Sequence, residues 1–381
     1  MSDLIERVTR EFERDQARAL RPVAVGEVPV SYASITDEWL THALCRDHAD
    51  ARVVAHRCID VDDGNTNRAR LLLTYNDAGL AAGLPPTAFC KATQQLHVRL
   101  FLATSGLIVG EELFYRKLRP LLDVDTPHCL FAAYDPQSYN SIFIFDDLAR
   151  QGAMFCEHTT EITRRRAESQ MAYLARLHGR LYDSPAMAES GVWTYEEMFA
   201  RLDGYLKLEG YSGKGFEEAI EVIPDRLHGR HDGIWKAVLA SNQLHARHPR
   251  TLTHNDVHLR NWYLDAADHM VLGDWQCIAA GHWARDVAYA MTTSLTTANR
   301  RMWEQELLAL YLDRFHEAGG PRIGVDDAWT FYRQHLCSSL IWWTSTLAMA
   351  YAQPRDALLE LIGRMAAATD DLDALQSFDG T

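Results

Sequence analysis

Three polar residues in the second half of the chain have the types and spacing that phosphoryl transfer needs. Within THNDVHLRNWYLDAADHMVLGD (residues 253–274), Asp256 lies five positions before Asn261, and Asp274 follows the short apolar segment Met270–Leu272. A carboxylate can orient an attacking hydroxyl and accept its proton, while an amide oxygen and a second carboxylate hold Mg²⁺ against nucleotide phosphates. Hard oxygen ligands suit Mg²⁺ better than zinc. The pattern therefore predicts Asp256 as the catalytic base and the other two as metal ligands.

A metal-dependent hydrolase is the alternative interpretation of the same loop. His254, Asp256 and His258 form an H-x-D-x-H cluster that could ligate a catalytic metal. Such a site needs further ligands, and the available His269 and His282 stand in no recognisable ligand pattern. This alternative also leaves the amide and the second carboxylate without a role. A plain turn whose polar side chains bond local backbone is the structural alternative.

The same residues carry a family resemblance. His254–Asn261 resembles the H-x-D-x-x-x-x-N catalytic loop of the protein-kinase-like fold, and Asp274-Trp-Gln276 resembles its metal-binding Asp motif. The Asp-Trp-Gln form and the later Asp286 resemble the aminoglycoside phosphotransferase and choline/ecdysteroid kinase-like branch. The short interval before Asp286 and the lack of A-P-E argue against a protein kinase. The resemblance implies an α+β, two-lobed protein-kinase-like fold, with a β-rich nucleotide-binding lobe at 1–147 and a mostly helical catalytic and acceptor-binding lobe at 148–381.

The resemblance further implies an ATP-dependent, Mg²⁺-assisted phosphotransferase that acts on a hydroxyl of a small molecule. In that family the counterpart of Asp286 bonds back to the catalytic loop, and His254 braces this loop. Arg260 lies inside the loop and either contacts the transferring phosphoryl group or is a solvated charge. Asn255 stands where the family most often has glycine, and asparagine tolerates left-handed backbone better than most residues. A catalytically silent kinase-like binding protein is a further alternative, against which the intact set of polar residues speaks.

Upstream residues predict the phosphate-binding turn. Two β-like runs, 52–62 and 68–75, are joined by Asp63-Gly-Asn-Thr-Asn67. Gly64 permits a tight turn, and the backbone N–H groups of Gly64 and Asn65 could approach a nucleotide phosphate. An ordinary hairpin turn would have the same sequence.

Lys91 and Glu111 are the predicted lysine–glutamate pair of the nucleotide site. Lys91 enters a strand, and the resemblance implies that it contacts the α- and β-phosphates. A helix predicted at 110–122 begins with Glu111, which resembles the glutamate that anchors this lysine; Glu112 is the open alternative. The helix should present one apolar face, composed of Phe114, Leu118, Leu121 and Leu122.

A continuous apolar strand, 141–145, leads into Asp146-Asp-Leu148. The resemblance implies that the backbone of Asp147 and Leu148 binds the adenine. The aromatic-rich segment 183–248 has the least defined pattern and lacks a dense run of carboxylates. Core packing is expected for most of its aromatic residues, and the acceptor is expected to be a less charged, partly apolar alcohol.

Composition limits the remaining possibilities. The chain has 381 residues and a formal net charge of −14, so nucleic acid and anionic membranes are poor partners. Its seven cysteines form no C-x-x-C, which favours reduced thiols and a cytoplasmic setting. The start of the chain, Met1–Ala19, predicts an amphipathic helix, and the dense charges of Met1–Arg18 predict no signal peptide. The most apolar segment, Leu340–Ala352, is too short to span a bilayer. The oligomeric state has no sequence signal.

Overall fold

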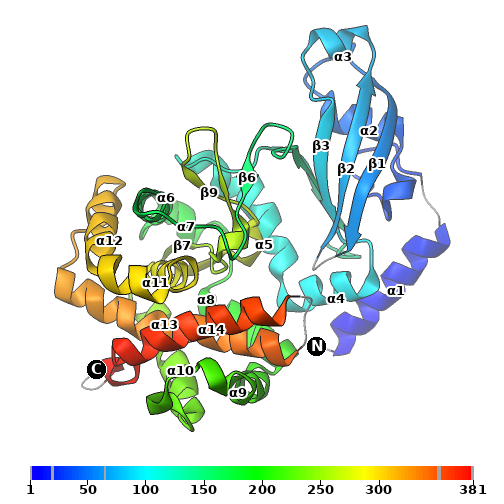
Figure 1. Ribbon diagram of the computed structural model, residues 1–381. Coiled ribbons are helices and arrows are strands. Elements are labelled where there is room, and N and C mark those ends of the chain that lie inside the picture. Colours follow the sequence, from blue (N-terminus) through cyan, green and yellow to red (C-terminus); the bar gives the residue numbers. More distant parts are fainter. Residues whose placement is uncertain (1, 19–20, 64–65, 350–352, 379–381) are drawn as a thin grey trace. The chain divides into compact units, whose positions relative to one another are not determined.

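The computed structural model describes residues 2–18, 21–63, 66–349 and 353–378. The chain packs as two compact units, Met1–Arg116 with Thr126–Ala153 and Lys117–Asp125 with Met154–Thr381 (Figure 1). The first unit contains an antiparallel sheet, and the second is mostly helical. The α+β class, with its strands early and its helices late, is therefore confirmed. The lobe boundary at 147/148 stays a prediction; the compact units themselves divide after Ala153.

The sheet of the first unit has the order β1-β2-β3-β5-β4, and every neighbouring pair is antiparallel. Its strands are β1 (Val53–Asp63), β2 (Asn67–Tyr75), β3 (Thr87–Ala92), β4 (Cys129–Tyr134) and β5 (Ser141–Asp146). Along β2 the residues that face the core alternate with less buried ones, as the two-residue period of a strand requires. The strands predicted around 52–62, 68–75, Lys91 and 141–145 are confirmed. Gly64 and Asn65 lie outside the described residues.

The helices of the first unit are α1 (Ser2–Arg18), α2 (Asp37–Leu44), α3 (Asp77–Ala81), α4 (Leu96–Ser105) and α5 (Leu107–Leu113). The Thr36 hydroxyl accepts a hydrogen bond from the Trp39 backbone N–H at 3.0 Å, which is the N-cap that a threonine at this place favours. Trp39 then packs edge-on against Phe131 of β4, with ring centroids 5.2 Å apart. This contact fastens α2 to the sheet.

The helix predicted at 110–122 is wrong at both ends. The chain instead forms α5, a π-helical turn and a 3-10 turn, with bounds Leu107–Leu113, Phe114–Leu118 and Arg119–Leu121. Pro120 has no backbone N–H and clashes with a preceding turn, so a regular α-helix cannot continue to 122. The changed winding rotates the apolar face, and Leu121 is 40% exposed although Phe114 and Leu118 are buried.

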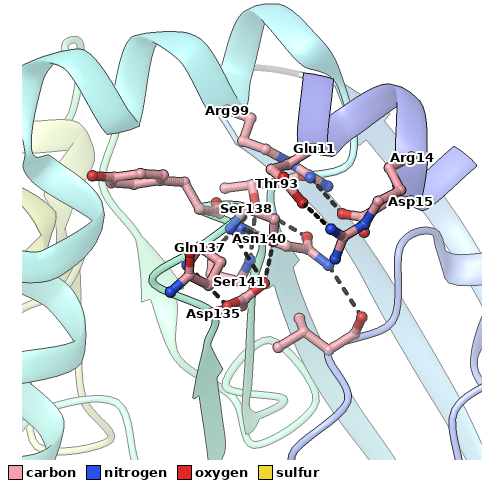
Figure 2. Close-up of polar contacts among 12 residues, drawn as sticks. Glu11, Arg14, Asp15, Thr93, Arg99, Asp135, Gln137, Ser138, Asn140 and Ser141 are labelled. Atoms are coloured by element: carbon pink, nitrogen blue, oxygen red, sulfur yellow. Dashed lines mark hydrogen bonds and ion pairs between the residues drawn. The ribbon is translucent and has the colours of Figure 1, made fainter. Parts of the chain in front are cut away.

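Helix α1 is fastened to the rest of its unit by a buried arginine. Figure 2 shows Arg99 of α4, whose Nη1 donates to Asp15 Oδ2 at 2.8 Å. The Arg99 Nε also donates to the carbonyl oxygen of Thr93 at 3.4 Å. The Thr93 hydroxyl in turn accepts from the Ser141 backbone N–H at 2.8 Å. Asp15 therefore compensates a charge that would otherwise be buried at the end of β3.

The second unit surrounds two small sheets with helices. Its helices are α6 (Arg164–Leu181), α7 (Pro185–Ala188), α8 (Tyr195–Leu206), α9 (Leu208–Glu218), α10 (His231–Arg247), α11 (Ala284–Ser294), α12 (Thr297–Glu317), α13 (Val325–Ala348) and α14 (Arg355–Asp371). Its strands are β6 (Met154–Phe155), β7 (Thr251–Thr253), β8 (Trp262–Leu264), β9 (Met270–Leu272) and β10 (Ala279–Gly281). Helix α13 packs against α9, α10, α11 and α14, so it is the centre of the helical core.

The segment 183–248 forms α7 to α10. Its buried aromatic residues are Tyr195, Phe199, Phe216 and Trp235, which confirms core packing for most of the aromatic residues considered there. Within the described parts of the chain, no helix combines the length and the apolar character that crossing a membrane requires.

Candidate active site

Two small sheets hold the ends of the predicted catalytic loop. Before the loop, β7 pairs with β10; after it, β8 pairs with β9 in a register that places Trp262 opposite Leu272. The Gly273 N–H continues this ladder by donating to the Asn261 carbonyl oxygen at 2.8 Å. Asn261 therefore lies beside the residue that precedes Asp274, and the hairpin brings the two predicted metal ligands to one end. Asp274 itself has left-handed backbone, with φ 57° and ψ 69°.

The amide of Asn261 has a fixed orientation. Its Nδ2 donates to the Asp256 carbonyl oxygen at 2.7 Å and to Asp256 Oδ2 at 2.9 Å. Because the nitrogen is used in this way, Oδ1 is the amide atom that can coordinate a cation. The loop thus fixes a carboxylate and an amide oxygen relative to each other, as the sequence spacing required.

Asp256 is an ionised carboxylate with further hydrogen-bond partners. Its side chain is 29% exposed, and its Oδ1 accepts from the Tyr289 hydroxyl at 3.3 Å and lies 3.5 Å from His258 Nε2. Burial raises the pKa of Asp256, but His258 and the Asn261 amide outweigh burial and lower that pKa to about 2. Sequence reasoning missed Tyr289, although it lies one helical turn after Asp286 and so on the same face of α11.

His254 is a fully buried brace. Its Nε2 donates to the Gly273 carbonyl oxygen at 2.9 Å, and its Nδ1 accepts from the Asp256 N–H at 3.3 Å. Burial lowers the pKa of His254 despite the nearby Asp286 and Asp256, so the imidazole is neutral. Both ring nitrogens bond backbone, which is the geometry of a positioning residue.

Asp286 ties the start of α11 to the loop, as predicted. Its carboxylate accepts backbone N–H bonds from His254 at 2.6 Å and from Asn255 at 2.9 Å. His178 Nε2 lies 3.3 Å from the same carboxylate, and its Nδ1 lies 2.9 Å from the Tyr311 hydroxyl. His178 is completely buried, so it is a packed structural histidine.

Asn255 adopts the left-handed backbone that was considered tolerable for it, with φ 66°. Its Nδ2 donates to the carbonyl oxygens of Thr253 at 3.2 Å and Cys277 at 3.0 Å. These bonds, which glycine cannot make, connect the loop to the segment after Asp274. They explain how asparagine stands where the family most often has glycine.

Arg260 has polar partners at the surface. Its Nη1 donates to Gln353 Oε1 at 2.7 Å, and its Nε lies 3.3 Å from Glu157. The side chain is 40% exposed. A contact between Arg260 and a phosphoryl group stays a prediction.

The geometry gives the hydrolase alternative no support. Among the described residues, no group of three or more histidine, cysteine, aspartate or glutamate side chains is arranged to hold a metal ion. His269 pairs with Asp265 at 3.2 Å in an exposed turn. His282 is buried and stacks on His335, with ring centroids 5.1 Å apart.

Lys91 and Glu111 form a buried ion pair in the first unit. The Lys91 Nζ lies 2.9 Å from Glu111 Oε2 and 3.0 Å from Oε1, and both side chains are less than 10% exposed. Glu112 instead pairs with Arg116. The structure therefore resolves which glutamate meets the lysine; the role of the pair in nucleotide binding stays a prediction.

The predicted hinge has local backbone partners. The Leu148 N–H donates to the Asp146 carbonyl oxygen at 3.0 Å, and the Asp147 carbonyl oxygen accepts from the Arg150 N–H at 2.9 Å. The buried Asp147 carboxylate accepts from Arg70 Nε at 2.6 Å. Adenine binding by the backbone of Asp147 and Leu148 stays a prediction, as does phosphate binding by Gly64 and Asn65.

Comparison with solved structures finds distant similarity over most of the chain. A choline kinase from Streptococcus pneumoniae has a TM-score of 0.48 at 11% identity, with 87% of this chain and 98% of that chain covered. An ethanolamine kinase from Plasmodium vivax also has a TM-score of 0.48 at 11% identity, with coverage of 88% and 86%. A macrolide 2'-phosphotransferase from Brachybacterium faecium has a TM-score of 0.42 at 14% identity, with coverage of 84% and 98%. Similarity at this level carries no information about the acceptor.

Comparison at the level of sequence is more specific. None of the curated protein sequences compared with the chain matches it significantly. The family model described as the ecdysteroid kinase-like family matches residues 111–319. This segment is more than half of the chain, and it runs from the glutamate of the buried ion pair through the whole catalytic loop to the end of α12. The chain therefore belongs to the ecdysteroid kinase-like family.

Proposed function

We propose that this protein is a Mg²⁺-assisted phosphotransferase that transfers the γ-phosphoryl group of ATP to a hydroxyl of a small molecule. The bond from Asn261 Nδ2 to Asp256 Oδ2, 2.9 Å long, carries the proposal because it locks a carboxylate and an amide oxygen into one rigid loop. Membership in a kinase-like family supports the same chemistry. Positioning and charge stabilisation are what phosphoryl transfer asks of a protein.

Asp256 is the proposed base. Its carboxylate accepts a hydrogen bond from the acceptor hydroxyl and aims the oxygen lone pair at the γ-phosphorus. With a pKa of about 2, the carboxylate is too weak a base to remove the proton in advance. The proton therefore moves to Asp256 as the new O–P bond forms and the bond between the γ-phosphorus and the β–γ bridging oxygen breaks.

Asn261 Oδ1 and the Asp274 carboxylate would hold Mg²⁺. The donor set fits the ion, because both are hard oxygens and the Asn261 nitrogen is already committed to Asp256. When bound, the ion neutralises charge on the phosphate oxygens. The left-handed backbone of Asp274 sets the direction in which its side chain leaves the hairpin.

Lys91 is proposed to neutralise the α- and β-phosphates. Its pairing with Glu111 keeps the ammonium group in one place within a buried setting, so its charge costs little reorganisation during the reaction. Lys91 belongs to the first unit and Asp256 to the second.

The acceptor is proposed to be a neutral, partly apolar alcohol. A small pocket beside the loop is lined by His258, Trp343, Leu358 and Leu361, among others. This pocket has room for about one water molecule, so the proposal rests on segment 183–248, which lacks the dense run of carboxylates that a polycationic acceptor would favour. We propose no nucleic-acid or membrane partner, in keeping with the net charge of −14.

The first test is thermal stabilisation by ATP, with and without Mg²⁺, on the wild type and on Asp274→Ala. A ligand that binds the native state raises the melting temperature by mass action. We expect a Mg²⁺-dependent rise in the wild type that disappears in the variant, followed by transfer of labelled phosphate to members of an alcohol library. No rise with any purine nucleotide would remove the proposal and favour a catalytically silent binding protein.

A further inference from the structure

Asp256 is connected to the helical core by a chain of two hydrogen bonds. The Tyr289 hydroxyl donates to Asp256 Oδ1 at 3.3 Å, and Trp343 Nε1 donates to the Tyr289 hydroxyl at 3.0 Å. Tyr289 lies on α11 and Trp343 on α13, and both side chains are buried. Neither residue belongs to the motifs of the catalytic loop.

The direction of this chain is fixed by chemistry. An indole nitrogen can only donate, so the phenolic oxygen of Tyr289 must accept from Trp343. The single proton of the phenol is then directed at Asp256. Burial and the neighbouring Asp256 raise the pKa of Tyr289 well above its usual range, so the phenol keeps that proton.

We propose that Tyr289 and Trp343 are positioning residues that hold the Asp256 carboxylate in a single orientation for attack by the acceptor hydroxyl. This inference rests on the function proposed above. Asn261 holds Oδ2, and Tyr289 holds Oδ1, so the carboxylate is restrained on both sides. The terminal torsion of an aspartate is otherwise broad, and Asp256 without Tyr289 would sample a wider range of orientations.

Trp343 also contacts His258, the other side chain that lies near Asp256 Oδ1. The rings of His258 and Trp343 meet edge to face, with centroids 5.3 Å apart, and His258 Nε2 lies 3.5 Å from Asp256 Oδ1. One indole therefore supports both groups that face this oxygen. Helix α13 is thus connected to the proposed base through the side chains of Trp343, Tyr289 and His258.

The test compares Tyr289→Phe with Tyr332→Phe in the full-length protein. Tyr332 is a matched control: it is buried, it lies on α13, and its hydroxyl donates to a carboxylate, Glu304 Oε2, at 3.2 Å. Both variants delete one bond from a buried phenol to a carboxylate, and Tyr289→Phe also removes the acceptor of the Trp343 N–H, so both should lower the melting temperature. Only Tyr289→Phe should lower kcat, by about 10–100-fold as expected for a misplaced reacting group, with the KM for ATP unchanged.

Trp343→Phe provides a second, independent reading. It removes the N–H and keeps an aromatic ring, so we expect a smaller fall in kcat in the same direction. In the double variant the loss should not exceed that of Tyr289→Phe alone, because the Trp343 N–H acts through Tyr289 and the retained aromatic ring keeps its contact with His258. If Tyr289→Phe does not fold, Trp343→Phe against Tyr332→Phe decides the question.

The outcomes separate this proposal from the one on which it rests. A wild type that neither binds ATP with Mg²⁺ nor transfers phosphate defeats the proposed function. An active wild type whose Tyr289→Phe variant keeps full kcat, while losing as much thermal stability as Tyr332→Phe, overturns the positioning role alone. A Tyr289→Phe variant whose KM for ATP rises at unchanged kcat also overturns it.

Discussion

The predicted catalytic loop of the second unit and the lysine pair of the first unit are built in contrasting ways. In the loop, His254, Asn255 and Asp256 each have several named partners, and Asp286 binds two consecutive N–H groups. The Lys91–Glu111 pair is instead a buried contact between a strand and a helix, in which Lys91 Nζ lies near both carboxylate oxygens. Directing a hydroxyl at phosphorus requires an exact angle, which takes several restraints, whereas neutralising phosphate charge requires mainly a fixed position.

This contrast gives the two regions different weaknesses. Loss of one partner in the loop changes orientation while the rest of the network remains. Loss of one member of the lysine pair removes the opposite charge beside a buried ion, which is costly because a buried ion has already lost its hydration. The following changes test that difference, from the largest expected effect to the smallest.

Asp256→Asn should have the largest effect on activity. The amide keeps the shape of the carboxylate but cannot accept the hydroxyl proton, so turnover should fall by roughly 10²–10⁴-fold. ATP-dependent stabilisation should persist, because Asn261 and Asp274 are unchanged. Steady-state kinetics and thermal shift measure the two effects, and near-normal turnover would refute the assignment of the base.

Lys91→Met and Glu111→Gln should each destabilise the first unit by roughly 3–5 kcal/mol, since each leaves a buried charge or a buried polar group without its partner. The double variant Lys91→Met/Glu111→Leu should recover most of that stability. It should nevertheless bind ATP poorly, because the phosphates lose their cation. Urea unfolding and ATP titration separate these effects; a double variant that binds ATP like the wild type would remove Lys91 from the nucleotide site.

Asp286→Asn tests the loop in the same way. The NH₂ group of the new amide would face one of the two backbone N–H groups and could not accept its hydrogen bond. The bond that is lost had a charged acceptor, and such bonds contribute about 1.5–3 kcal/mol. We expect a loss of about 3 kcal/mol in the free energy of unfolding together with reduced kcat. Unchanged kcat at a lower melting temperature would show that the loop keeps its orientation without this anchor.

Acid should destabilise the second unit through its buried histidines. His335 stacks on His282, and the backbone N–H of His282 donates to His245 Nδ1 at 2.8 Å. Burial lowers the pKa of His335 to about 4. Burial lowers the pKa of the other two as well. In the unfolded chain these three histidines become protonated below about pH 6.5, whereas in the native state they stay neutral to lower pH. The free energy of unfolding therefore keeps its full value above about pH 6.5. It falls towards pH 4, by up to about 1.4 kcal/mol per pH unit for each histidine.

Urea unfolding between pH 7 and pH 5, followed by tryptophan fluorescence, measures this slope. Trp39 is the single tryptophan of the first unit, so the signal reports mainly the second. His335→Gln should give a shallower slope than the wild type. Equal slopes would mean that His335 is not responsible for the acid sensitivity.

Asn255 should give the smallest effect. Asn255→Ala places an ordinary residue at φ 66° and removes two bonds to backbone carbonyls, so about 1–2 kcal/mol of stability should be lost. Asn255→Gly relieves the backbone strain but still lacks the two bonds, and we expect an intermediate value. A variant Asn255→Ala as stable as the wild type would show that this loop position is not strained.

Local patterns in the sequence were sufficient for the elements whose geometry is local. The spacing of Asp256 and Asn261 within one loop determined that they meet, because five residues between two strand ends leave little freedom. The β-like runs at 52–62 and 68–75 predicted two of the strands of the first unit, and the type of residue at 255 allowed its left-handed backbone. The family resemblance added the role of Asp286, which no spacing in the chain could have shown.

Packing between distant segments decided the rest. Glu111 meets Lys91, and Glu112 does not, because the start of α5 at Leu107 sets the phase of the helix. Tyr289 and Trp343 reach Asp256 only because α11 and α13 pack together. Tyr289 lies 33 positions after Asp256 in the sequence, and Trp343 lies 54 positions after Tyr289. Hydrophobic burial drives such packing without regard to sequence separation, so spacing cannot reveal it. Residue types and local spacing identify the side chains that could do the proposed chemistry, and packing between distant segments fixes how these side chains are held.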